Sequence, residues 1–371
     1  MKESLSMKAA VLEQFNAPLV IRDVDIAKPA AHEVLVRTAA VGLCHSDLHY
    51  IEGLRAVPLP MVLGHEVSGV VEAVGAHVSG LKPGDHVVGC LSVFCGTCPA
   101  CVSGRQVLCA NPDVKQAPGA AKRLSMHGQP VTQNFNLSGF AEYMLVHPNA
   151  LVKVRDDMPL DRAALLGCAV ITGTGAVFRS ARVEPGATVA VVGCGGVGLS
   201  AINGAAIAGA ARIIAIDLLA DKLELARTFG ATDVIDSSRT DPVAAVRELT
   251  GGGVEYAFEC IGNKTASEQC WAMLRPGGTV TVIGLFRPGV KVELPGSDFI
   301  TEKRLQGSLM GSNRLTQDIP RLVELYMQGK LKLDELISQR IALDDINAGF
   351  EAMKAGHVAR SVIVFPGVGG L

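Results

Sequence analysis

The sequence predicts an α/β fold, with a region of short, mostly antiparallel strands joined to a doubly wound parallel sheet. Of the 371 residues, 49% are hydrophobic, only 4% are aromatic and 41 are glycine, a composition typical of aliphatic elements joined by many tight turns. From residue 7 to about 150, apolar and polar residues alternate between turns, as in EVLVRTAAVGL and EVSGVVEAVG, which indicates antiparallel strands. From about 170 to 310, apolar strands alternate with helical segments, which indicates a parallel sheet covered on both faces.

Six short apolar stretches are the expected parallel strands, at residues 187–193, 212–217, 233–236, 254–260, 279–284 and 304–309. Helices are expected between them, as in GGVGLSAINGAAIAGA and DKLELARTFG, because apolar residues recur there at helical spacing. After 310, IPRLVELYMQG predicts a further helix and RSVIVF a closing strand. This tail cannot bury itself alone, so we expect it to pack on the first region.

The charge and hydropathy patterns exclude several classes of protein. The 36 acidic and 34 basic residues give a net charge of -2 without a basic stripe, which disfavours a nucleic-acid partner. The N-terminal MKESLSMKAAVLEQF lacks the apolar core of a signal peptide, and no run approaches about 18 consecutive apolar residues. We therefore expect a soluble cytoplasmic protein with no membrane partner, whose ten cysteines are better suited to metals than to disulfides.

A strand, a glycine-rich turn and a helix follow one another around the sequence GCGGVG, which comprises Gly193, Cys194, Gly195, Gly196, Val197 and Gly198. In such a G-x-G-x-x-G turn the first glycine permits the turn, the second admits a pyrophosphate, and the third lets helix and strand pack closely. Asp217 ends the next strand, 19 residues after the last glycine, where its carboxylate can bind the adenosine ribose and repel a 2′-phosphate. The pattern predicts an NAD site. Lys222 either reaches the same ribose or is a solvated helix lysine.

Four cysteines, Cys95, Cys98, Cys101 and Cys109, follow the spacing C-x2-C-x2-C-x7-C in one polar loop. Four thiolates from one loop suit a tetrahedral zinc ion with every position filled, which is a structural site. Iron–sulfur ligation also uses four cysteines, but the compact spacing fits a closed zinc lobe, at about residues 90–112, better.

A second set of possible ligands is dispersed along the chain: Cys44 in GLCHSDLH, His65 in GHE and Cys168 in LLGCAVITG. Each alone is ambiguous, because buried cysteines are usually packing residues. Beside a nucleotide domain, two thiolates and one imidazole indicate a zinc ion with an open fourth position. Such an ion lowers the pKa of a bound alcohol towards 7, and the alkoxide can pass a hydride to a nicotinamide.

These motifs together resemble the zinc-containing medium-chain alcohol dehydrogenases, from about Met7 to the C-terminus. The resemblance implies a GroES-like catalytic domain over residues 1–169 and 310–371, and a Rossmann coenzyme domain over 170–309. It also implies that Cys44, His65 and Cys168 hold the catalytic zinc, and that the four-cysteine lobe holds a structural zinc. The expected assembly is a homodimer, or a tetramer made of two.

The resemblance assigns further roles, one residue at a time. Ser46 matches the hydroxyl that takes the substrate proton, and His49 the histidine that passes it to solvent. Glu66 is similar to an acid near the zinc, and Asp47 to the carboxylate that orients a ligand imidazole. The remaining expected cofactor contacts are Thr172 near the nicotinamide, Arg360 on the pyrophosphate, His45 where many members carry an arginine, and Ile283.

Four apolar residues are candidates for the substrate pocket by position, namely Leu54, Leu91, Phe135 and Leu285. They predict a hydrophobic alcohol, although each is equally compatible with packing. The leading hypothesis is therefore an NAD-dependent alcohol dehydrogenase acting on a primary or secondary alcohol. The alternatives are a glutathione-dependent formaldehyde dehydrogenase, which needs a basic anchor for glutathione carboxylates that the sequence does not identify, and a non-catalytic NAD- or zinc-binding protein.

Overall fold

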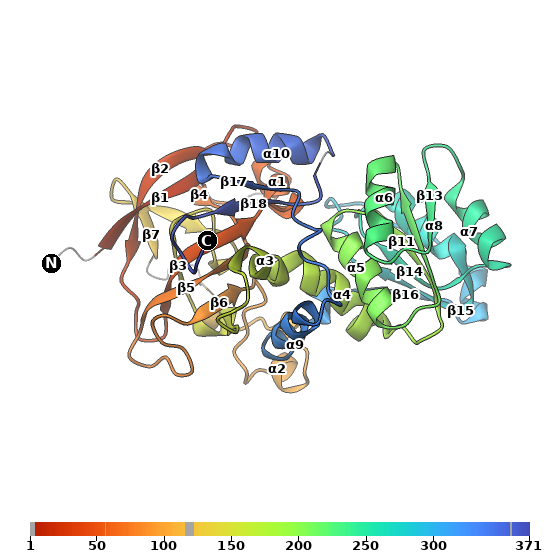
Figure 1. The fold of residues 1–371 in the computed structure, drawn as a ribbon, viewed down its shortest axis with the longest axis horizontal. Helices are drawn as coiled ribbons and strands as arrows, with labels where there is room; N and C mark the ends of the chain where they lie inside the picture. The colour runs from red at the N-terminus through yellow and green to blue at the C-terminus, as the bar shows by residue number, and fades with distance from the viewer. Residues whose placement is uncertain (1–3, 56, 116–121, 357) are drawn as a thin grey trace. The chain divides into compact units, whose positions relative to one another are not determined.

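A computed structural model of the protein describes residues 4–55, 57–115, 122–356 and 358–371. Its contacts divide the chain into two compact units. Unit 1 consists of Met1–Cys168, Arg314–Met327 and Ile337–Leu371, and unit 2 of Ala169–Asn313 and Gln328–Leu336. The colours in Figure 1 show that unit 1 is built from both ends of the chain, whereas unit 2 comes mainly from its middle.

Unit 1 contains two groups of β-strands. Five strands close a barrel in the order β1-β2-β7-β8-β4, with bounds β1 (Ser4–Leu12), β2 (Val20–Ala27), β7 (Leu124–Met126), β8 (Gln129–Gln133) and β4 (Met61–Val62). A seven-stranded sheet has the order β10-β6-β5-β3-β18-β17, with β9 also on β3. Its bounds are β10 (Leu151–Lys153), β6 (His86–Gly89), β5 (Glu66–Val74), β3 (Val34–Gly42), β18 (Ser361–Val364), β17 (Gln339–Ile341) and β9 (Tyr143–Val146).

The named strand pairs of unit 1 are antiparallel except β4 with β8 and β17 with β18, as the alternating pattern predicts. In β2, for example, Val24 and Ile26 are fully buried while Asp23 is exposed, because successive side chains point to opposite faces. The helices are α1 (His45–Ile51), α2 (Pro99–Val102), α3 (Leu160–Leu165), α9 (Leu315–Met327) and α10 (Ile346–Lys354). The C-terminal strand β18 pairs with β3, so the tail packs on the first region as expected.

Unit 2 is a six-stranded parallel sheet in the order β13-β12-β11-β14-β15-β16. The bounds are β11 (Thr188–Val192), β12 (Arg212–Asp217), β13 (Asp233–Asp236), β14 (Val254–Glu259), β15 (Leu274–Val282) and β16 (Arg304–Gly307). All six predicted strands are confirmed, and β15 begins five residues before its predicted start. This strand order is that of a doubly wound dinucleotide-binding sheet.

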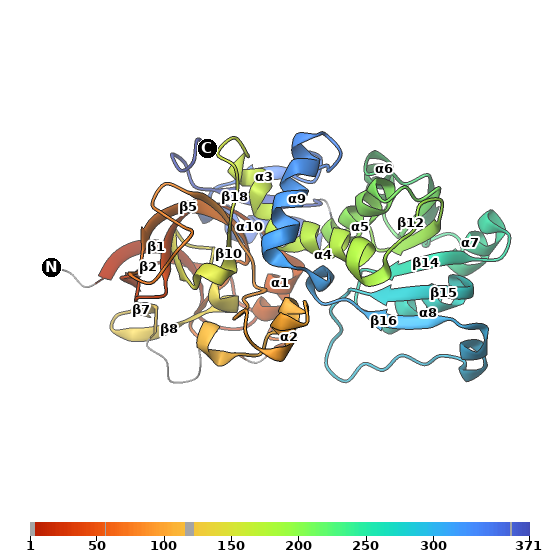
Figure 2. The ribbon, with the colours of Figure 1, turned by 90° about the horizontal axis from the view of Figure 1, so that it is seen from below.

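The helices of unit 2 are α4 (Ile171–Gly175), α5 (Gly196–Ile207), α6 (Ala220–Thr228), α7 (Pro242–Thr250) and α8 (Lys264–Met273). Figure 2 shows α5 and α6 on one face of the sheet. Helices α7 and α8 pack against each other and against β14. Trp271 of α8 is 1% exposed and donates its indole N–H to Asp298 at 3.0 Å, while the ring of Phe299 lies 4.8 Å from the indole.

The division into units differs from the expected one at three places. Residues 310–313 and 328–336, and also Ala169, belong to unit 2 rather than to the catalytic domain. The second segment is held by α5, because the side chain of Asn203 donates to the carbonyl of Lys330 and accepts from the backbone N–H of Lys332. Leu331, Leu333 and Leu336 of this segment are also buried, and the pattern of the tail alone did not reveal this placement.

Within the described residues, one helical run is long and apolar enough to cross a membrane by length and composition. This run, Leu160–Ala181, is 83% buried over its most apolar window. Core helices of folded domains have the same character, because a helix that is apolar on every side is buried by its neighbours. The run is therefore weak evidence for a membrane span.

Candidate functional site

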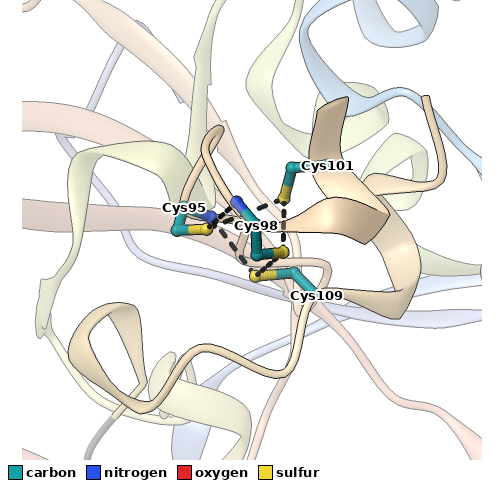
Figure 3. A group of neighbouring side chains, drawn as sticks. All are labelled: Cys95, Cys98, Cys101 and Cys109. Atoms are coloured by element: carbon teal, nitrogen blue, oxygen red, sulfur yellow. Dashed lines mark hydrogen bonds between the residues drawn. The ribbon is translucent and has the colours of Figure 1, made fainter. Parts of the chain in front are cut away.

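The four-cysteine loop brings its sulfurs to one point. The Sγ atoms of Cys95, Cys98, Cys101 and Cys109 all lie within 4.8 Å of one another, and Figure 3 shows the four side chains converging. Cys98 Sγ is 3.5 Å from Cys101 Sγ and 3.9 Å from Cys109 Sγ. All four cysteines are free, since a disulfide requires sulfurs about 2.05 Å apart.

These distances match a tetrahedral thiolate site. Two sulfurs that bind one zinc ion at about 2.3 Å lie about 3.8 Å apart, close to the values above. Backbone N–H groups of Cys98 and Thr97 donate to Cys95 Sγ at 3.3 and 3.4 Å. Hydrogen bonds from Thr97 and Cys98 lower the pKa of the Cys95 thiol to about 5, whereas burial raises the pKa of Cys101 to about 12. The loop therefore already favours one thiolate, and a cation would be needed to ionise the buried sulfur.

The dispersed ligand set also converges, although its members come from three segments of unit 1. The ligand atoms of Cys44, His65 and Cys168 lie within 4.8 Å of one another and all three residues are buried. Cys168 Sγ is 3.2 Å from His65 Nε2. Cys44 caps the N-terminus of α1, His65 precedes β5, and Cys168 lies in a π-helical segment, Leu166–Val170.

Asp47 orients the imidazole of this cluster. Its Oδ1 lies 3.0 Å from His65 Nδ1 and accepts the backbone N–H of Gly64 at 3.2 Å. With the proton on Nδ1, the lone pair of Nε2 faces the sulfurs, as a metal ligand requires. Burial opposes a charge on His65, but Asp47 and Cys44 raise its pKa well above the ordinary value. The surroundings thus favour positive charge between the two thiols, and the donor set fits a zinc ion.

A buried ion pair stands beside the cluster. Arg360 Nε lies 3.3 Å from Glu66 Oε2, and the two side chains are 3% and 0% exposed. Burial opposes the charge of Arg360, but Glu66 and then the thiols of Cys44 and Cys168 raise its pKa. The expected contact of Arg360 with a pyrophosphate stays a prediction, and within unit 1 this side chain faces Glu66.

Helix α1 divides its residues between two environments. Asp47 is fully buried toward His65, whereas Ser46 and His49, three residues apart and thus on one helix face, are half-buried. His45 is exposed. The helix therefore holds the orienting carboxylate on one side and the two expected proton carriers on another.

The glycine-rich turn of unit 2 has the backbone that its sequence predicts. Gly193 has φ +95°, and the nearest neighbour of an added Cβ would be the side chain of Ile261 at 2.7 Å. Gly195 faces open space, whereas a Cβ on Gly198 would lie 1.8 Å from the carbonyl oxygen of Gly193. Gly196 and Val197 open helix α5. The first and third glycines are thus required by the chain itself, and the second leaves room for a ligand.

Asp217 lies at the end of β12, beside this turn. One carboxylate oxygen accepts the backbone N–H of Cys194 at 2.7 Å, and the other accepts those of Leu218 and Leu219 at 2.8 and 3.1 Å. The contact with Cys194 was not evident from the sequence. It fixes the carboxylate against the turn, while Lys222 of α6 is half-buried nearby in the chain.

Two further expected cofactor residues also lie in unit 2. Thr172 is buried and its hydroxyl donates to Met310 Sδ at 3.5 Å. Ile283 directly follows β15, is half-buried, and its backbone N–H donates to the carbonyl of Glu259. Leu285, a pocket candidate, is 40% exposed.

Of the pocket candidates in unit 1, Phe135 is the one that the structure brings to the dispersed cluster. Its ring centroid is 5.3 Å from that of His65 and 5.5 Å from that of Tyr50, both edge to face. Sequence reasoning missed Tyr50, although it directly follows His49 on α1. Leu54 and Leu91 are half-buried. Phe135 has φ +50°, a strained backbone conformation of the kind that collects at functional sites.

Comparison with known proteins places the chain in a family. Residues 30–156 match the model of the alcohol dehydrogenase GroES-like domain, and residues 196–328 that of the zinc-binding dehydrogenase. The probable S-(hydroxymethyl)glutathione dehydrogenase 1 of Schizosaccharomyces pombe is 40% identical over 97% of each chain.

Solved structures agree with this assignment. An alcohol dehydrogenase zinc-binding domain protein from Burkholderia ambifaria is 37% identical with a TM-score of 0.94, covering 98% of this chain and 100% of its own. Benzyl alcohol dehydrogenase from Acinetobacter calcoaceticus is 36% identical with a TM-score of 0.92, covering 97% and 99%. With both thiolate clusters and the dinucleotide sheet in place, the chain belongs to the zinc-containing medium-chain alcohol dehydrogenases and is an NAD-dependent oxidoreductase.

Proposed function

We propose that this alcohol dehydrogenase oxidises hydrophobic primary or secondary alcohols to aldehydes or ketones, reversibly, at the cluster of Cys44, His65 and Cys168. The convergence of these three buried ligand atoms within 4.8 Å is the observation that carries the proposal. The aromatic ring of Phe135 against His65 supports a hydrophobic substrate, because it places apolar surface beside one of the ligands.

Zinc held by these three residues would act as a Lewis acid that lowers the pKa of the substrate hydroxyl, and NAD+ would accept the hydride. Asp47 keeps His65 in the tautomer that directs Nε2 to the metal. Arg360, which is paired with the buried Glu66, adds a positive charge that lowers the pKa of the Cys44 thiol, which matters because unpaired charges are costly in a dry interior.

The substrate proton leaves through the half-buried face of α1. Ser46, two residues after the ligand Cys44, takes the proton from the hydroxyl, and His49 passes it to water. Ser46 and His49 are one helical turn apart, a spacing that supports a relay between them. Imidazole is suited to the second step, since its unperturbed pKa is about 6.5.

For the cofactor, the open space at Gly195 accommodates a pyrophosphate at the N-terminus of α5. Asp217, with Lys222, binds the adenosine ribose and discriminates against the 2′-phosphate of NADP. Thr172, Ile283 and Arg360 complete the contacts, and exposed His45 is a weaker anion ligand than arginine. The Asp217→Gly variant tests this assignment: its kcat/KM for NADP+ relative to NAD+ should rise about tenfold or more, because a like-charge repulsion is removed. An unchanged ratio would exclude the role of Asp217.

A substrate panel tests the reaction itself. Benzyl alcohol and octanol should be turned over with a higher kcat/KM than ethanol, and Phe135→Leu, which removes the ring but keeps apolar volume, should raise the KM for benzyl alcohol about threefold to tenfold. Tyr50→Phe, which keeps its ring, is the matched control. The proposal fails if no alcohol reduces NAD+ with the zinc-loaded enzyme.

The second candidate substrate is S-(hydroxymethyl)glutathione, because the relative from Schizosaccharomyces pombe is named as a probable dehydrogenase of that compound. A tripeptide with two carboxylates needs a basic anchor at the pocket, and none has been identified among the residues assigned to it. The apolar Leu54, Leu91 and Phe135 favour the simple alcohol instead. A kcat/KM for S-(hydroxymethyl)glutathione above that for benzyl alcohol would reverse this order.

We also infer that the enzyme is cytoplasmic and forms a homodimer or a tetramer of two dimers. The expected contact between subunits is at β16, which is the edge strand of the sheet in unit 2 and pairs with β15. Phe299 and Ile300, directly before this edge, are 51% and 87% exposed, and exposed apolar residues beside a free strand edge favour pairing. A monomer mass by light scattering at micromolar concentration would exclude this assembly.

A further inference from the structure

Two exposed histidines of unit 1 that belong to neither thiolate cluster lie close together. His77 Nδ1 is 3.1 Å from His32 Nε2, and the ring centroids are 4.7 Å apart at an interplanar angle of 62°. His32 belongs to the connection between β2 and β3, and His77 to that between β5 and β6. A hydrogen bond across this distance pairs the N–H of one ring with the lone pair of the other, so a metal ion that binds both nitrogens would take the place of that proton.

The two connections are tied together by the backbone. The N–H of His77 donates to the carbonyl of Ala31, and that of Gly75 donates to the carbonyl of Glu33, both at 2.8 Å. A Cβ on Gly75 would lie only 1.9 Å from the carbonyl oxygen of Ala30. The two connections therefore approach so closely that only glycine fits at position 75. This close approach holds the two imidazoles next to each other.

Glu33, next to His32, anchors the same connection from the other side. One carboxylate oxygen accepts from Arg123 Nε at 2.6 Å, where the arginine is 9% exposed, and the other accepts the backbone N–H of Ala30 at 3.0 Å. Arg123 in turn donates to Gln133 at 2.9 Å. The histidine pair thus stands on a hydrogen-bonded scaffold, and little ordering remains to be done when a ligand binds.

We propose that His32 and His77 form a third metal site, separate from the two thiolate clusters, for a divalent transition ion such as Zn²⁺ or Ni²⁺. Two nitrogens bound at about 2.05 Å to one ion lie about 2.9 Å apart at a right angle and about 3.3 Å apart in a tetrahedron, and the observed distance falls between these values. Imidazole pairs select such ions over Mg²⁺ or Ca²⁺, which prefer oxygen. Both oxygens of Glu33 are engaged, so water fills the other positions and the ion exchanges readily.

Calorimetry on the zinc-loaded enzyme tests the site. After excess metal has been removed, Zn²⁺ should bind as one additional, weaker equivalent. Either His32→Asn or His77→Asn should weaken this binding about tenfold or more, because loss of a ligand costs at least as much as loss of an outer-shell partner. His127→Asn, which alters another exposed histidine with φ +51°, is the matched control and should bind as the unaltered enzyme does.

Retention of the untagged enzyme on a Ni²⁺-chelate resin gives a second reading. The unaltered enzyme and His127→Asn should be retained, and both pair variants should elute early, with alcohol oxidation and thermal unfolding unchanged in the absence of added metal. The site is excluded if the enzyme binds no zinc beyond the two thiolate equivalents. It is also excluded if the pair variants bind the extra ion as tightly as His127→Asn.

Discussion

The two thiolate clusters of unit 1 use similar ligands but are assembled in different ways. Cys95 and Cys109 are 14 residues apart in one loop, and their sulfurs are supported by nearby backbone N–H groups. His65 and Cys168 are 103 residues apart, and their cluster is supported by buried charges. A local cluster can form with little of the surrounding fold, whereas the dispersed one exists only when β5, α1 and the π-helical segment are all in place.

Chain entropy alone does not explain the difference. Closing a loop of 103 rather than 14 residues costs about 2 kcal/mol more, a modest amount beside the cost of burying thiolates. The dispersed cluster offsets that cost with positive charge: His65 and Arg360 lower the pKa of the Cys44 thiol, and Asp47 supports the charge of His65. The comparison teaches that the closed site serves stability, while the charged support of the other prepares it for chemistry.

The largest effect should come from removing a ligand of the dispersed cluster. Cys44→Ser should lower kcat/KM for benzyl alcohol by about a thousandfold or more, because the Lewis acid supplies several kcal/mol at about 1.36 kcal/mol per factor of ten. Zinc content should fall from two ions to one, measured by emission spectrometry. Cys90→Ser, at a buried thiol outside both clusters, is the control. Full turnover by Cys44→Ser would contradict a catalytic role for the dispersed cluster.

The opposite pattern is expected for the local cluster. Cys101→Ser should also leave one zinc ion, but its main effect should be a fall in Tm of roughly 10 °C, because a structural zinc contributes several kcal/mol to folding. Activity measured well below that temperature should stay within about threefold of the unaltered enzyme. If Cys101→Ser were as inactive as Cys44→Ser while folded, the two sites would not have separate tasks.

A smaller effect should follow from the orienting carboxylate. Asp47→Asn keeps the shape but removes the charge beside His65, and such second-sphere changes typically cost about 10- to 100-fold in activity or metal affinity. Competition with a zinc chelator measures the affinity, and steady-state kinetics the activity. An unchanged zinc affinity together with unchanged activity would mean that the dispersed cluster does not depend on charged support.

The smallest effect should be found at the loop of the local cluster. Thr97 donates its hydroxyl to Cys95 Sγ at 3.5 Å, a long hydrogen bond worth about 1 kcal/mol at most. Thr97→Val should therefore speed the release of one zinc ion to a chelator by no more than about fivefold, since 1 kcal/mol corresponds to that factor. Thr97→Ser keeps the hydroxyl and should release zinc at the original rate. Equal rates in the two variants would show that the hydroxyl contributes nothing.

The sequence predicts local features well and long-range features less well. The spacing of Cys95 to Cys109 and the glycines from Gly193 to Gly198 carry their geometry in one short segment, and all six parallel strands were recognised by their apolar runs. The dispersed ligands were grouped only because a nucleotide domain and then a family resemblance made a catalytic zinc plausible, since nothing in the segments around Cys44 and Cys168 encodes that they meet.

Several contacts between distant segments could not be predicted. The edge-to-face contacts of Phe135 with Tyr50 and His65 depend on a strained turn, and the placement of 328–336 depends on hydrogen bonds to Asn203. The pairing of Arg360 with Glu66 joins two residues of unit 1 that are far apart in the sequence. Each of these depends on how elements pack, which neither periodicity nor motif spacing encodes.

The indole at the centre of unit 2 has a practical consequence for such experiments. Trp271 is the sole tryptophan of the chain, and it is buried against Phe299 and Asp298. Fluorescence excited at the long-wavelength edge of tryptophan absorption therefore reports on the nucleotide-binding unit alone. Emission that shifts at a different temperature from the release of zinc would show that the two units melt in separate transitions, and would order those transitions in one optical scan.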